Sequence, residues 1–117
     1  MGAERTAERR DGKLADSVAE AVRVIVGACD PRTIVLFGSE ARGEAGPRSD
    51  IDLLVVVDDA GDWARAGRAA LRAVAGLTPD VDVIVTTQAL VDANRETPGT
   101  VIRPALREGR VVYSRAA

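Results

Sequence analysis

The sequence predicts a small α/β domain in which a mixed sheet is flanked by helices, and three observations support this prediction. Apolar residues recur at helical spacing over residues 13–28. Two short apolar runs, residues 33–37 and 53–57, have the length and the β-branched composition of buried strands. Helical and strand-like segments then alternate along the rest of the chain, which is typical of an α/β fold.

The predicted elements, in chain order, are a helix, two strands, a helix, a strand, two helices and a final strand: residues 13–28, 33–37, 50–57, 63–77, 80–86, 88–94, 97–108 and 110–114. The first helix ends at Asp30, because proline at position 31 disfavours helix in the residue before it. Residues 3–11 either extend this helix or fray. Two glycines and a proline make residues 43–49 a loop, so the strands on either side of it can pair as neighbours, antiparallel or in a mixed arrangement.

Apolar runs and the positions of proline and glycine also predict the elements of the second half of the chain. The last five residues of the strand at 50–57 are all apolar, which predicts that helices cover both of its faces. The helix at 63–77 is expected to place these residues along one side: Trp63, Ala66, Ala70, Leu71 and Val74. Pro79 ends that helix, and Gly109 stops the helix at 97–108. Asp58 and Asp59 follow the second strand and are expected to be solvated.

Composition excludes several classes of function. The 117 residues suffice for one domain, so residues 1–117 are expected to form a single domain, with residues 1–12 at an end that can fray. A net charge of −2 gives no surplus of positive charge for constitutive nucleic-acid binding. The sequence contains no histidine, which excludes histidine general bases, His-containing triads and most zinc sites.

The remaining expectations concern location and redox chemistry. Cys29 is the only cysteine, so no internal disulfide can form, and a reducing compartment and an inert, partly buried thiol are expected. No stretch reaches the roughly 18–20 apolar residues that span a membrane. The charged N-terminus is followed by no apolar segment typical of a signal peptide. The expected location is therefore the cytoplasm.

Aspartates at the starts of two strands are the candidate catalytic and metal-binding residues. Asp50 and Asp52 point to the same face of a strand, because side chains alternate there, and their mutual repulsion favours a bound cation. Asp82 lies among valines, where an ionised group in a central strand needs a partner, and it completes the cluster if its strand lies beside the second. Oxygen ligands suit Mg²⁺ or Mn²⁺. Asp80 competes for the third role, and turn or cap roles remain alternatives for each aspartate.

A Gly-Ser turn supplies the candidate nucleotide-binding residues. Gly38 ends the strand at 33–37, and its missing side chain lets the backbone approach a ligand closely. The amides that follow, together with the hydroxyl of Ser39, can hold phosphate oxygens. Arg42 and Arg48 flank this turn and are either phosphate contacts or solvated loop residues.

These residues together resemble the signature of the DNA polymerase β-like nucleotidyltransferases. Residues 36–43 (LFGSEARG) and 49–55 (SDIDLLV) carry the Gly-Ser pair and the Asp-x-Asp pair with ten residues between them. Residues 81–83 (VDV) resemble the segment with the third carboxylate. With the ending at 108–113 (EGRVVY), the resemblance covers most of the chain from Thr33 and implies a polymerase β palm-like fold.

The short length is similar to that of the minimal nucleotidyltransferases, many of which are antitoxins paired with HEPN-domain ribonuclease toxins. The resemblance implies transfer of AMP from ATP to a hydroxyl of such a partner protein, with two Mg²⁺ ions. By position, Gly38, Ser39 and Arg42 bind the nucleotide, and three aspartates form the catalytic and metal-binding set: Asp50, Asp52 and Asp82. Glu40 departs from the basic or neutral residue that many members carry directly after the Gly-Ser pair.

Two other function classes compete with this hypothesis. A catalytically inactive binding module would neutralise a partner toxin by contact, and the complete motif argues against it. A phosphoacceptor signalling domain requires an acidic pair after the first strand and a late lysine, whereas this strand ends in Gly38 and the only lysine is Lys13.

Overall fold

The computed structural model describes residues 2–38, 51–59, 63–77 and 80–115, and the side chains of its first helix from residue 16 onward. The elements are α1 (Gly2–Cys29), β1 (Thr33–Phe37), β2 (Ile51–Val57), α3 (Trp63–Val74), β3 (Val81–Thr87), α4 (Gln88–Asn94), α5 (Ile102–Glu108) and β4 (Arg110–Ser114). Their order agrees with the order predicted from the sequence. None of the described helices combines the length and the apolar composition needed to cross a bilayer.

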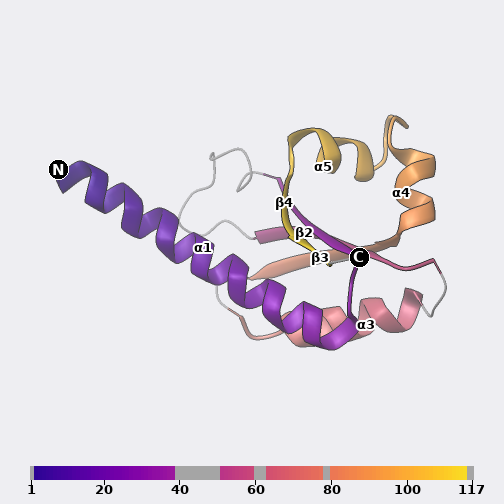
Figure 1. Cartoon of the computed structure of the whole chain (residues 1–117), viewed down its shortest axis with the longest axis horizontal. Helices are drawn as coiled ribbons and strands as arrows, with labels where there is room; N and C mark the ends of the chain where they lie inside the picture. The colour runs from indigo at the N-terminus through magenta and orange to yellow at the C-terminus, as the bar shows by residue number, and fades with distance from the viewer. Residues whose placement is uncertain (1, 39–50, 60–62, 78–79, 116–117) are drawn as a thin grey trace.

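A mixed sheet organises the molecule, with the strands in the order β3-β2-β1-β4 (Figure 1). β1 pairs antiparallel with β2 and with β4, so the two strands on either side of residues 43–49 are neighbours, as predicted. β2 pairs parallel with β3, and α3 forms the crossover that a parallel connection requires. The mixed sheet predicted from the sequence is therefore confirmed.

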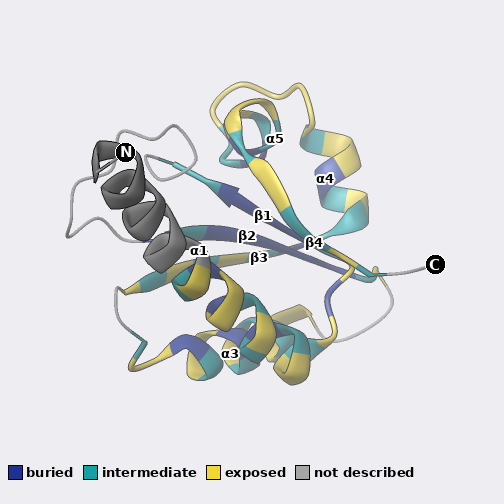
Figure 2. Ribbon diagram, turned by 60° about the vertical axis from the view of Figure 1, so that its left-hand side comes forward, coloured by how far each residue is buried: buried dark blue, intermediate teal, exposed yellow. Residues whose placement is uncertain are grey.

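Helices cover both faces of the sheet, as Figure 1 shows: α1 and α3 lie on one side, α4 and α5 on the other. Alternate residues of β2 divide between the two cores. Leu53 and Val55 pack with α1 and α3, whereas Leu54 and Val56 pack with α4 and α5. β2 is accordingly the most deeply buried strand in Figure 2, which confirms the cover predicted from its continuous apolar run.

The bounds of three helices differ from the predicted ones, and a glycine with a positive φ accounts for two of the differences. α1 begins at Gly2, so residues 3–11 extend it. α3 ends at Val74, three residues early, and Gly76 beyond it has a φ of 87° that a right-handed helix does not contain. α5 begins at Ile102 instead of residue 97, because Gly99 has a φ of 85°. Pro104 is tolerated in the first turn of α5, where its missing N–H has no helical partner to lose.

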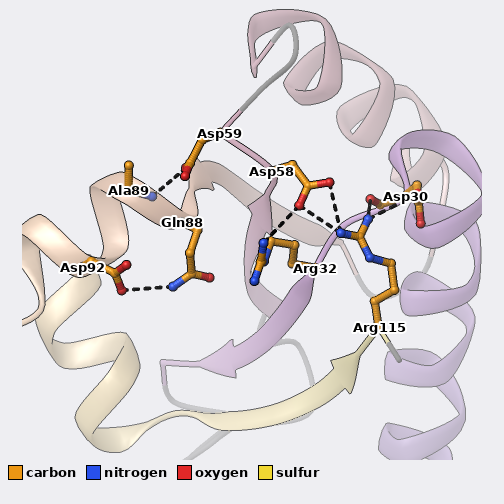
Figure 3. Close-up of polar contacts among 8 residues, drawn as sticks. All are labelled: Asp30, Arg32, Asp58, Asp59, Gln88, Ala89, Asp92 and Arg115. Atoms are coloured by element: carbon orange, nitrogen blue, oxygen red, sulfur yellow. Dashed lines mark hydrogen bonds and ion pairs between the residues drawn. The ribbon is translucent and has the colours of Figure 1, made fainter. Parts of the chain in front are cut away.

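Asp58 is partly exposed to solvent, as predicted, and it is also bound by two arginines, which the sequence does not indicate. Arg115 Nη2 donates to both carboxylate oxygens of Asp58, at 2.9 and 3.0 Å, and Nη1 donates to the backbone oxygen of Asp30 at 3.1 Å (Figure 3). Arg32 Nη1 adds a longer contact of 3.4 Å to Asp58. Asp59 likewise accepts from the backbone N–H of Ala89, at 2.7 Å. Arg115 thus joins the end of β4 to the ends of α1 and β2.

This contact predicts a pH-dependent stability. The hydrogen bond from Arg115, more than any other influence, lowers the pKa of Asp58 below its ordinary value. A carboxyl whose pKa is lower in the folded chain stabilises the fold above its unfolded pKa, about 3.9, and loses that contribution as pH falls through the folded value. Arg115→Gln should therefore melt at a lower temperature than the wild type at pH 7, with the difference shrinking below pH 4.

The control for this prediction is Arg110→Gln, the same change at an exposed arginine of β4. We expect its melting temperature to follow the wild type at every pH. A difference between Arg115→Gln and the wild type that persists undiminished to pH 2 would contradict the proposed role of Asp58.

Candidate active site

The end of β1 and the starts of β2 and β3 meet at one end of the sheet, where the predicted site lies. Phe37, the last residue of β1, is the register partner of Asp52 in β2. Asp52 is in turn the register partner of Asp82 in β3. The order across the sheet is therefore the Gly38 turn, then Asp52, then Asp82.

The structure brings the carboxylates of Asp52 and Asp82 to the same face of the sheet. The two residues are register partners on parallel strands, which lie about 4.7–4.9 Å apart, and side chains at one register position share a face. That face is the one on which Leu54 and Val56 pack under α4 and α5. Asp52 is half-buried and Asp82 is exposed, so the pair opens from the protein towards solvent across β3.

One reason for choosing Asp82 from the sequence is wrong, although the choice itself agrees with the register. β3 is an edge strand and Asp82 is exposed, so no buried charge demands a partner there. Asp80 precedes the strand, and its backbone oxygen accepts from the N–H of Ile51 at 3.0 Å. The register of β2 against β3, and not burial, is what sets Asp82 beside Asp52.

Gly38 leaves the space that the Asp52 carboxylate occupies. Its φ is 80°, which side-chain-bearing residues rarely adopt. A Cβ built at this position would overlap Asp52 Oδ2 and lie 3.3 Å from Asp52 Cγ. Two independent features therefore require glycine at position 38: its positive φ and the closeness of the Asp52 carboxylate.

Several predicted site residues lie outside the described part of the chain. These are Ser39, Arg42, Arg48 and Asp50, together with Glu40. Within the described residues there is no group of three His, Cys, Asp or Glu side chains that could hold a metal ion, and the third predicted ligand, Asp50, is not among them. Their roles remain predictions.

The described residues fit a divalent cation of the magnesium type. Asp52 and Asp82 supply only oxygen donors, on adjacent strands and on one face, which is the donor chemistry that Mg²⁺ prefers. Gly38 supplies a close backbone approach beside one of these donors. The chemistry of this donor set also argues against zinc, which favours nitrogen and sulfur ligands.

Gly38→Ala should damage the site more than the fold. The new Cβ must displace the Asp52 carboxylate or the turn itself, and the φ of 80° adds strain. The sequence predicts that Mg²⁺-ATP binds here, and we expect the rise in melting temperature that such binding would cause to be absent in this variant. Gly76→Ala is the control, because its φ of 87° is similar but nothing lies within 4 Å of its Cβ. Equal retention of the ATP effect in both variants would contradict the close approach at Gly38.

Cys29 has the character expected of an inert thiol. It is half-buried, and its Sγ donates to the backbone oxygen of Ile25 at 3.5 Å. Desolvation, and then the nearby charge of Asp30, raise the pKa of this thiol. The protonated form therefore prevails at neutral pH, and Cys29 is a poor nucleophile.

The sequence places Trp63 and Leu71 along one side of a helix with three smaller apolar residues, and the structure leaves both of these large side chains exposed. Leu71 is 54% exposed and Trp63 is 48% exposed. Trp63 Nε1 donates to the backbone oxygen of Val85 in β3 at 2.6 Å. Helical periodicity cannot predict the exposure of these two side chains. That exposure depends on how far the edge strand β3 extends beneath α3.

Comparisons with known proteins agree with the geometry. The family profile described as polymerase beta, nucleotidyltransferase matches residues 23–117. A Sulfolobus solfataricus protein provisionally described as a nucleotidyltransferase, solved at 1.40 Å, has a TM-score of 0.62 and 22% identity, over 88% of this chain and 82% of that chain. A toxin–antitoxin structure with AMP-PNP has a TM-score of 0.55 and 21% identity, over 86% of this chain and 73% of that chain.

No curated protein sequence matches the chain significantly. The two structural neighbours, both below 25% identity, establish the fold alone. The family profile covers most of the sequence and includes the Gly38 turn and all three aspartates. The chain belongs to the polymerase beta nucleotidyltransferase family.

Proposed function

We propose that this protein is a Mg²⁺-dependent enzyme that transfers AMP from ATP to a hydroxyl of a partner protein. The observation that carries the proposal is the in-register pair of Asp52 and Asp82 beside the Gly38 turn. Membership of the nucleotidyltransferase family supplies the reaction class. ATP as the donor is suggested by the AMP-PNP in one structural neighbour.

Each group has a task in this reaction. The backbone at Gly38, with Ser39 and Arg42, binds the triphosphate, and Asp50, Asp52 and Asp82 would hold the cations. A divalent cation bound there supplies positive charge to the phosphate oxygens and to the leaving group. The acceptor oxygen bonds to the α-phosphorus, the bond to pyrophosphate breaks, and Asp82 accepts the hydroxyl proton. Positioning and charge stabilisation are thus the main contributions of the protein.

The acceptor we propose is a toxin that this protein silences, of the HEPN ribonuclease type. One structural neighbour is a toxin–antitoxin structure, which supports a protein partner. The described elements are used to build the sheet and to cover its two faces, so a large acceptor must bring its own recognition surface. We place this activity in the cytoplasm, where ATP, Mg²⁺ and a reduced Cys29 coexist.

The test uses ATP labelled either on the α-phosphate or on the γ-phosphate, with Mg²⁺, the purified protein and an extract of the source cells. Nucleotidyl transfer moves only the α label into a protein band, whereas a kinase would move only the γ label. Mg²⁺-ATP should also raise the melting temperature of the purified protein, because a ligand that binds only the native state stabilises it.

The alternative function is a binding module that neutralises a toxin by contact alone. The toxin–antitoxin neighbour is equally compatible with that role. Absence of label in every band, together with no effect of Mg²⁺-ATP on melting, would favour the binding module over the enzyme. Glu40 would then be the first residue to substitute.

A further inference from the structure

Exposed apolar side chains gather along the edge of the sheet that carries Asp82. Among the described residues, four large hydrophobic side chains are exposed, and they are Trp63, Leu71, Ile84 and Val111. Three of these four belong to β3 or to α3, the helix that packs on it. Val111 lies alone on β4, at the opposite edge. Solvent-exposed apolar groups that cluster in this way mark interaction sites more often than scattered ones do.

The helix contributes one flank of this cluster. Trp63, Gly67 and Leu71 follow one another at intervals of four residues, so they line one side of α3. Trp63 Nε1 donates to the backbone oxygen of Val85, and a Cβ at Gly67 would lie 3.9 Å from Val85 Cβ. This side of α3 therefore faces β3 at Trp63 and Gly67, and Leu71 is the next residue on the same side of the helix, where it is exposed.

The strand contributes the other flank, on the face of the active site. Val83 and Val85 pack into the core under α1 and α3, so Ile84 between them points to the opposite face with Asp82. Helices α4 and α5 bury the neighbours of Ile84 on that face, Leu54 and Thr86, but leave Ile84 39% exposed. Ile84 is thus an open apolar side chain about 6.6 Å along the strand from Asp82.

The position of this cluster assigns it to the acceptor side of the reaction. The order Gly38 turn, Asp52, Asp82 across the sheet sets the triphosphate at β1 and leaves β3 for the incoming hydroxyl. An acceptor that reaches the exposed Asp82 comes to lie beside the free edge of β3. A protein acceptor would cover Ile84, which shares a face with Asp82, and would reach Trp63 and Leu71 by extending around this edge to α3.

Docking by side chains fits this edge better than addition of a strand. β3 has a strand partner on one side only, so its outward backbone groups are the ones a new strand would use. The carbonyl of Val85 already accepts from the Trp63 indole at 2.6 Å. The indole also stands where the added strand would lie. A partner must therefore bind the exposed side chains.

The charge on α3 indicates the chemistry of the partner. The helix carries Arg65, Arg68 and Arg72 on its outer side and contains no acidic residue, in a chain of net charge −2. A basic flank beside an apolar strip complements a partner with an apolar centre and an acidic rim.

We propose that Trp63, Leu71 and Ile84, flanked by Arg68 and Arg72, form the docking surface for the acceptor protein, here named the β3-edge surface. The partner is a protein with an apolar centre and an acidic rim, which presents its hydroxyl to Asp82 and its acidic residues to Arg68 and Arg72. This inference rests on the proposed function, because it concerns the second substrate of the same site. Tryptophan and arginine are also the residues most enriched among those that dominate binding energy at interfaces.

The experiment compares Leu71→Gln/Ile84→Thr with the wild type in transfer from α-labelled ATP, over a dilution series of the source-cell extract. We expect the variant to need about tenfold more extract for half-maximal labelling, the effect of losing one strong interface contact. Val111→Thr makes the same kind of change on the opposite edge strand and should behave as the wild type. The rise in melting temperature with Mg²⁺-ATP should persist in both variants, because neither changes the nucleotide side.

Charge reversal provides a second, independent variant. Arg68→Glu should also require more extract, and raising the salt concentration should weaken labelling by the wild type more than labelling by this variant. Arg23→Glu on α1 is its control, because Arg23 is also exposed but lies off the β3-edge surface. If the double variant melts below the assay temperature, Arg68→Glu alone decides the question.

The possible failures are distinguishable. Undiminished labelling by Leu71→Gln/Ile84→Thr and by Arg68→Glu, with a labelling wild type, would overturn the β3-edge surface and leave the proposed function intact. No label with the wild type would overturn both. A dimer of the wild type that Leu71→Gln/Ile84→Thr dissociates, seen by light scattering, would show that a second copy occupies this surface, and would also overturn the proposal.

Discussion

Asp52→Asn should lower nucleotidyl transfer by at least about 10²–10³-fold, the loss seen when one preorganised electrostatic contact of a transition state is removed. Asparagine keeps the size of the side chain in the space beside Gly38, so the fold should persist. It removes the negative charge with which Asp52 would hold a cation in the proposed reaction. The measurement is the initial rate of labelling from α-labelled ATP at saturating Mg²⁺, alongside the melting temperature without nucleotide.

Asp92→Asn is the matched control for this experiment. Asp92 is an exposed carboxylate on α4 that accepts from Gln88 Nε2 at 3.0 Å, remote from the predicted site at the start of β3. We expect it to label at the wild-type rate. Asp82→Asn and Asp50→Asn should resemble Asp52→Asn. Full activity of the double variant Asp50→Asn/Asp52→Asn would refute the assignment of the catalytic carboxylates.

Gly109→Ala should destabilise the fold by about 1–3 kcal/mol, the usual cost of forcing an extra methyl group into a packed interior. Gly109 ends α5 with an ordinary φ of −81°, so backbone strain is not the cause. A Cβ there would overlap the backbone oxygen of Ala105 and lie 2.6 Å from Val35 Cγ1 and 2.9 Å from the oxygen of Leu36. Backbone atoms cannot yield cheaply, so α5 would have to move away from β1.

Gly27→Ala provides a control of opposite sign. Gly27 is an exposed position of α1, and nothing lies within 4 Å of its Cβ. Alanine there should stabilise the protein by roughly 0.5–1 kcal/mol, because glycine is less favourable than alanine within a helix. Both variants can be compared by urea unfolding at one temperature. A Gly109→Ala protein as stable as the wild type would show that α5 and β1 separate more readily than their contacts indicate.

The sequence predicts the sheet well because burial and periodicity are local signals. The apolar run of β2 and the alternation at Asp52 place their side chains correctly without any knowledge of the neighbours. The sequence predicts that Asp52 and Asp82 lie side by side only if their two strands are neighbours. It does not decide this, because the register depends on how α3 crosses the sheet. The valines around Asp82 predict a central strand, whereas β3 lies at the edge of the sheet.

Features that depend on contacts between distant parts of the chain are not predicted, because burial and periodicity report only on the local sequence. The contact between Arg115 and Asp58 joins residues 57 positions apart, and no sequence pattern in either segment predicts it. Leu71 continues the apolar pattern of α3, but that pattern is wider than the surface that α1 and β3 cover. The predicted bounds of α3 and α5 were too long because a positive φ at Gly76 and Gly99 outweighs helical periodicity nearby.

The parallel pairing of β2 with β3 also determines at which stage of folding the two carboxylates come together. β1 and β2 form an antiparallel pair that brings Gly38 and Asp52 together. Asp82 is brought to them by the parallel crossover through α3, and closing such a non-local connection is in general slower than pairing two antiparallel neighbours. Incompletely folded chains therefore lack the carboxylate pair, and a newly made chain acquires it only when the crossover is complete. Nucleotide present during synthesis would selectively stabilise chains that have passed this step.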